Sequence, residues 1–169
     1  MKVAAAGAGL SSTPASVASM TDDHNSLTWF HRLSMDDKVH LLRDPYGALP
    51  PRLVDQFLSR PGVVGTYWMS QISSTRWTLV PAEAARIADQ RDQLEWWWSH
   101  IDDADQAYLV EHRSEELPKE YASVVTSAGS TGSNPALVVV MVADNRTGRF
   151  RLPLMVDVFV ELKARDRGL

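Results

Sequence analysis

The chain has 169 residues, of which 44% are hydrophobic and 22% are charged. This composition is typical of a folded globular domain, and the length is sufficient to bury a substantial core. The chain has no cysteine, which excludes disulfides, thiolate metal sites and cysteine nucleophiles. It has no apolar run of the roughly 20 residues that a membrane-spanning helix requires. These features predict a cytoplasmic protein that does not enter a membrane.

The formal net charge of −4 is unevenly distributed along the sequence. Residues 81–120 contain eleven acidic and four basic residues, a net charge of −7, whereas residues 144–169 contain six basic and four acidic residues, a net charge of +2. An acidic middle and a mildly basic end favour packing within the protein or a basic protein partner. They do not favour a nucleic-acid surface, which is normally strongly basic.

Residues 1–26 are rich in small and polar residues and have no apolar periodicity, which predicts a disordered leader. The alanine- and glycine-rich start of this leader lacks the Leu-, Ile- or Phe-rich centre of an export signal. A second methionine, Met20, precedes the first periodic sequence, so the native start is left open between Met1 and Met20. We expect residues 27–169 to form a single globular domain.

Two short helices are predicted at the start of this domain. Ser34 is a suitable N-cap for a helix that ends at Arg43, and the apolar residues of this segment recur at intervals of three and four. A second helix is predicted to begin at Pro51, with a buried apolar face, and to end before Pro61-Gly62.

The next segment predicts a β-hairpin followed by the longest helix. Residues 63–69 and 76–80 are rich in aromatic and β-branched residues and are separated by a serine- and threonine-rich turn. Pro81 suits the first position of a helix that covers residues 82–101. Asp102 is placed to cap the helix that follows it.

Beyond these elements, a short helix is predicted over residues 119–126 and a flexible loop over residues 127–135, which are rich in serine and glycine. The apolar, β-branched run 137–142 favours a buried strand. A turn ending in Gly148 would return the chain as a partner strand over residues 149–152, which predicts a second β-hairpin.

Residues 153–166 have two interpretations. Their apolar residues alternate as in a strand, and they also form one helical face. We favour the helix because Pro153 suits a helix start better than a central strand, and because basic residues lie near the end of the segment. The complete pattern predicts an α+β fold of five or six helices and two β-hairpins, which could merge into one small antiparallel sheet.

Three successive tryptophans at positions 96–98 are the most unusual feature of the sequence. On a helix they span about 200°, at roughly 100° per residue, which is more than one core face can easily take. Trp98 fits the apolar stripe, Trp97 flanks it, and Trp96 should point elsewhere. The alternative to partner binding is that Trp96 packs on a second surface of the same domain. The candidate partner-binding residues are Trp96, Trp97, Tyr67, Trp68 and Trp77.

Arg52, Gln56 and Arg60 lie four residues apart on the helix predicted from Pro51, opposite its apolar face. Two helices followed by a basic stripe are compatible with DNA contacts. However, the connection between these helices is longer than a helix-turn-helix requires and the region is nearly neutral. A solvated helix face is therefore favoured, and DNA binding is kept as an alternative.

The five histidines show no metal-ligand spacing, and no catalytic residue, metal or cofactor is predicted. His100 and Arg113, with Trp77, are candidates for a polar pocket. Our leading hypothesis is a non-catalytic interaction or regulatory protein that binds another protein through an aromatic and acidic helix surface. The alternatives are a small-ligand binder or enzyme whose pocket has no sequence signature, and a DNA-binding regulator. Self-association is left open.

Overall fold

The computed structural model describes residues 27–59, 69–73, 76–130, 143–144 and 146–169. The predicted leader lies outside these ranges. The elements in chain order are α1 (Thr28–His31), α2 (Met35–Arg43), α3 (Pro51–Ser59), β1 (Met69–Ser73), β2 (Arg76–Leu79), α4 (Pro81–Trp98), α5 (Asp103–Glu111), the 3₁₀ helix η3 (Lys119–Tyr121), α6 (Ala122–Thr126), the 3₁₀ helix η4 (Ser127–Gly129) and α7 (Leu154–Asp166).

The predicted α+β class is wrong, because the described residues are mostly helical. They form seven α-helices, and their strands are limited to the short antiparallel pair β1–β2. This pair also differs from the predicted first hairpin. β1 begins at Met69, which pairs with Leu79, and continues through residues that we expected in the turn. The predicted strand 63–69 lies outside the described residues except for Met69.

The predicted second hairpin is also not seen. Residues 137–142 lie outside the described ranges, and residues 149–152 form no strand. Phe150 instead makes isolated bridges with Leu117 and Ala143. The backbone N–H of Leu117 donates to the Phe150 carbonyl at 2.7 Å, and the Phe150 N–H donates to the Leu117 carbonyl at 3.0 Å. The buried Phe150 therefore pairs with the loop before η3 and with Ala143.

Several helix boundaries are confirmed, because local capping chemistry determines them. The Ser34 hydroxyl accepts a hydrogen bond from the Asp37 N–H at the start of α2. The Asp102 carboxylate accepts one from the Asp105 N–H, at 2.7 Å, at the start of α5. Residues 154–166 form α7 directly after Pro153, so the helical interpretation of this segment is confirmed.

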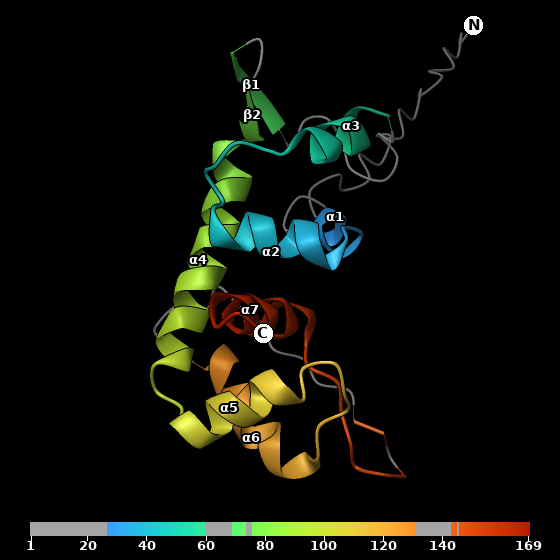
Figure 1. Cartoon of the computed structure of the whole chain (residues 1–169), viewed down its shortest axis with the longest axis vertical. Coiled ribbons are helices and arrows are strands. Elements are labelled where there is room, and N and C mark those ends of the chain that lie inside the picture. Colours follow the sequence, from blue (N-terminus) through green and yellow to red (C-terminus); the bar gives the residue numbers. More distant parts are fainter. Residues whose placement is uncertain (1–26, 60–68, 74–75, 131–142, 145) are drawn as a thin grey trace, which may run out of the picture.

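Figure 1 shows the arrangement of the helices. α4 runs along one side of the molecule, past α2 and α7. The β1–β2 pair and α3 lie near the N-terminal end of α4, and α5 and α6 lie near its C-terminal end. α7 lies between α2 and α5 and contacts both of them as well as α4, which places it at the centre of the fold.

The core is built around α7, which is apolar on most of its circumference. The ring of Phe159 packs edge-on against that of Trp98, with centroids 5.9 Å apart. Lys163 joins α7 to α4 through Glu95, with N–O distances of 2.6 and 2.7 Å. The buried residues of α7 are Met155, Val156, Val158, Phe159, Val160, Leu162 and Ala164.

The first residues of the predicted loop 127–135 pack against α4. Residues 127–129 form η4, and Ala128 is fully buried. The Gln93 side chain donates a hydrogen bond to the Ala128 carbonyl at 2.8 Å. Residues 131–135 of this loop lie outside the described ranges.

Candidate functional site

The solvent-facing side of α4 carries one large exposed aromatic residue. Asp89, Asp92, Trp96 and His100 recur at intervals of three and four along the α4 helix and the turn that follows it, so they share one face. All four residues are exposed. The exposed fraction of Trp96 is 51%. We call these four residues the Trp96 face.

His100 holds the Trp96 ring from one side. The two rings are stacked, with centroids 3.8 Å apart and an interplanar angle of 18°. The His100 Nδ1 lies 2.7 Å from the backbone oxygen of Trp96, which fixes the imidazole over the last turn of α4. The other face of the indole is therefore presented in a defined orientation.

Trp97 and Trp98 belong to the core. Their exposed fractions are 1% and 7%. The Trp97 Nε1 donates to the Val124 carbonyl at 2.9 Å and to the Ser127 hydroxyl at 3.1 Å. The prediction of Trp97 as a partner-binding residue is therefore wrong, since α6 and η4 cover the side of α4 that we expected to be open.

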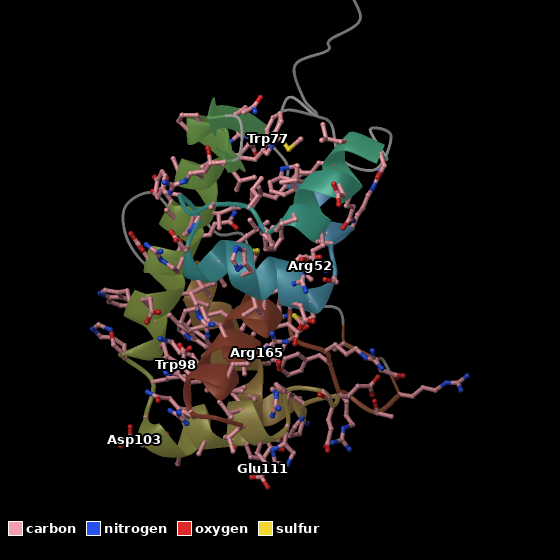
Figure 2. All side chains as sticks on the ribbon, turned by 45° about the horizontal axis from the view of Figure 1, so that its top comes forward. Arg52, Trp77, Trp98, Asp103, Glu111 and Arg165 are labelled. Carbon is pink, nitrogen blue, oxygen red and sulfur yellow. The ribbon has the colours of Figure 1, made fainter. Side chains whose placement is uncertain are left out.

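The remaining aromatic candidates do not join the Trp96 face. Tyr67 and Trp68 lie outside the described residues. Trp77 is half-buried on β2 and packs against the core. Figure 2 shows Trp77 near the N-terminal end of α4 and Trp98 near its other end. With a rise of about 1.5 Å per residue, the 18 residues of α4 separate the two ends by about 27 Å.

His100 and Arg113, the two residues predicted for a polar pocket, lie in different surroundings. His100 stacks on Trp96, whereas Arg113 lies beyond the far end of α5 and donates to Glu161 at 2.8 Å. Neither cavity described at Arg113 is lined by His100.

Arg52, on α3 (Figure 2), is engaged with the buried carboxylate of Asp37 at 3.0 Å. Gln56 is half-buried on the same helix, and Arg60 lies outside the described residues. Arg52 thus connects α3 to α2, a structural contact that the sequence pattern did not indicate.

A polar cavity of about 380 Å³ lies beside α7. Its walls come from the start of α2, the turn after α5, the segment before α7, and α7 itself. We call it the α7 cavity. The polar side chains that line it are Arg113, Ser114, Glu115, Arg151, Asp157 and Glu161.

The pKa values of the two α7 carboxylates in this cavity are shifted in opposite directions. Burial alone would raise the pKa of Glu161, but hydrogen bonds from Arg165 and Arg113 lower it below its ordinary value. The pKa of Asp157 is raised to about 6, first by burial and then by the charge of Glu161, against the opposing charges of Lys38 and Arg151. A half-buried carboxyl with a raised pKa in a cavity is typical of functional sites.

Our sequence reasoning identified Arg113 but missed the other cavity residues. One signal was available. Asp157 and Glu161 are two acids four residues apart on a helix that is otherwise strongly apolar, so both must point to one face of a buried element.

Comparison with protein-family models, with curated proteins and with solved structures found no significant match to the chain. Across the described helices, none is both long and apolar enough to span a bilayer. The same ranges contain no group of three or more histidine or acidic side chains placed to hold a metal ion.

Proposed function

We propose that this chain is a non-catalytic interaction or regulatory protein that binds a basic segment of another protein through the Trp96 face. The observation that carries the proposal is the exposure of Trp96 itself. Its indole is 51% exposed, whereas the next two indoles of the same helix are buried in the core. Tryptophan is among the residues most enriched where binding energy concentrates in protein interfaces.

Rigidity supports this assignment. The stack of Trp96 on His100 restricts the rotamers of both side chains before a partner arrives. Ordering a flexible side chain on binding costs about 0.5–1.5 kcal/mol, and a ring that is already fixed avoids much of that cost. The open side of the indole is therefore suited to receive a flat or cationic group.

The charge around the indole favours a basic partner. Asp92 and Asp89 lie one and two turns before Trp96, and Asp102 and Asp103 follow at the start of α5, all of them exposed. Arg91, which is bonded to Asp92 at 2.8 Å, is the basic side chain within this acidic stretch. A lysine or arginine can stack on an indole while neighbouring carboxylates bind its charge.

A peptide-binding experiment tests the proposal. Fluorescence anisotropy would compare a labelled lysine- and arginine-rich peptide with a glutamate-rich peptide of equal length. We expect only the basic peptide to bind. Trp96→Ala should weaken binding about tenfold or more, which is the scale of an interface hot spot.

The matched control is Tyr46→Ala. Tyr46 is an aromatic residue of similar exposure, 58%, in the connection between α2 and α3. We expect this variant to bind the basic peptide like the native chain. Equal binding by the native chain and Trp96→Ala, or no binding of the basic peptide at all, would contradict the proposal.

A further inference from the structure

The α7 cavity supports an inference that does not depend on the Trp96 face. Its charges divide into those that are already paired and those that are not. Glu161 accepts from Arg113 and from Arg165, each at 2.8 Å, and Arg165 also donates to Asp36 at 2.7 Å. These two acids and two bases neutralise one another. Figure 2 shows Arg165 on α7.

Asp157 differs from Glu161 in its surroundings. Within the described part of the chain, no side chain donates a hydrogen bond to its carboxyl group and none forms an ion pair with it. Lys38 and Arg151 act on it only as charges at longer range. Burial removes part of the water around this carboxylate, and no described side chain replaces it with a hydrogen bond, so the charged form is disfavoured.

The other charges on the cavity wall are placed toward solvent. Arg151 is 81% exposed and lies 3.9 Å from Glu116, which is at the limit of an ion pair. Glu115 is exposed in the turn after α5 and also lines the cavity. Once the paired groups are set aside, the cavity lining presents two carboxylates, Asp157 and Glu115, together with the guanidinium group of Arg151.

Lys38 carries the opposite charge to Asp157 but does not donate a hydrogen bond to it. Lys38 is buried on α2, and burial, its largest influence, lowers its pKa against the raising effect of Asp157. Its ammonium group is therefore itself held in an environment that disfavours charge. A donor that enters from the open side of the cavity can approach Asp157 directly.

We propose that the α7 cavity binds a small molecule with a primary ammonium group, which donates its hydrogen bonds to the Asp157 carboxylate. The cavity volume of about 380 Å³ lies at the lower end of the range for small-molecule sites. An aliphatic diamine could reach Glu115 with its second ammonium group. An α-amino acid could instead place its carboxylate near Arg151.

Isothermal titration calorimetry with defined probes tests this proposal. The probes are 1,4-diaminobutane, glycine, 1,4-butanediol and succinate. We expect binding of at least one of the two amines and no binding of the neutral diol or the dianion. Binding of the diamine alone identifies a diamine site, and binding of glycine alone identifies an amino-acid site.

Variants connect the binding to Asp157. Asp157→Asn should weaken binding of the amine about tenfold or more, because a charge-assisted hydrogen bond is lost. Asp55→Asn removes an exposed aspartate on α3 and should leave binding unchanged. Circular dichroism of both variants checks that the helices remain folded.

The pH dependence provides a second readout. Charged groups face Asp157 from α2 (Lys38), from the segment before α7 (Arg151), from the turn after α5 (Arg113 and Glu115) and from α7 (Glu161). With the pKa of Asp157 at about 6, most of the carboxylate is protonated at pH 5 while an aliphatic amine stays charged. Affinity for the amine should fall about tenfold between pH 7 and pH 5.

Three results would overturn the proposal: no binding of either amine to the native chain, equal binding to Asp157→Asn, or tighter binding of succinate than of the amines. Each result can be obtained with the Trp96 face intact, so failure here is distinguishable from failure of the proposed function.

Discussion

α4 and α7 are the two longest described helices, and they place their polar residues in opposite environments. α4 has 18 residues and one side open to solvent, where Trp96 and its acidic neighbours lie. α7 has 13 residues and is covered on most of its surface, so its acids lie in or beside the core. A charge on the exposed side of α4 costs little, whereas a charge on α7 must be paired or shift its pKa. The exposed Trp96 should therefore contribute little to stability, whereas the half-buried Asp157 should lower it.

The largest expected effect is that of Trp97→Ala. Removal of this fully buried indole leaves a cavity between α4 and η4 and deletes two hydrogen bonds. We expect the free energy of unfolding to fall by about 3–5 kcal/mol. Urea denaturation measures this loss. A loss similar to that of Trp96→Ala would mean that the two indoles are not in different environments.

Glu161→Gln should be next in size. The substitution removes the carboxylate that Arg113 and Arg165 share, and we expect a loss of about 2 kcal/mol in the free energy of unfolding. It also removes a negative charge that raises the pKa of Asp157. That pKa should fall below about 6, which a carboxyl NMR titration can measure, and an unchanged value would show that Glu161 does not act on it.

Asp157→Asn should stabilise the protein at neutral pH. An acid whose pKa is raised in the folded state binds its proton more tightly when folded, so stability falls as the pH rises from about 4 to about 6 and stays lower above that. The variant should gain about 1 kcal/mol at pH 7, after allowance for partial exposure of the group. Below about pH 4 the native chain and the variant should be equally stable. A destabilised variant at pH 7 would indicate that Asp157 has a partner.

Trp96→Ala should have the smallest effect on stability. Half of its surface is already in water and its main contact is the stack on His100, so we expect a change within about 0.5 kcal/mol. Thermal unfolding of the variant measures this. Together with reduced peptide binding, it would separate the function of Trp96 from the stability of the fold.

The helix boundaries were predictable because they depend on neighbouring residues. Ser34 and Asp102 cap the helices that follow them, and Pro153 precedes α7. The sheet was not predictable in the same way. Phe150 lies in a segment with strand-like sequence, but its backbone exchanges hydrogen bonds with Leu117, which is 33 residues earlier in the chain. The sequence near either residue does not indicate this pairing.

The candidate sites were predictable only in part. Helical geometry showed that three adjacent indoles cannot share one face, and Trp96 is exposed as that argument requires. The burial of Trp97 depends on α6 and η4, whose positions are set by tertiary packing. The α7 cavity combines Arg113 with Asp157 and Glu161, which are more than 40 residues further along the chain. Residues so far apart carry no common spacing in the sequence.

The central position of α7 has a consequence for biosynthesis. It is the last of the described helices to be made, yet α2, α4 and α5 all pack against it. Until α7 emerges from the ribosome, the apolar surfaces of those three helices that pack against it have no partner. The nascent chain must therefore pass through a stage with exposed hydrophobic surface, during which binding by a chaperone would protect it from aggregation.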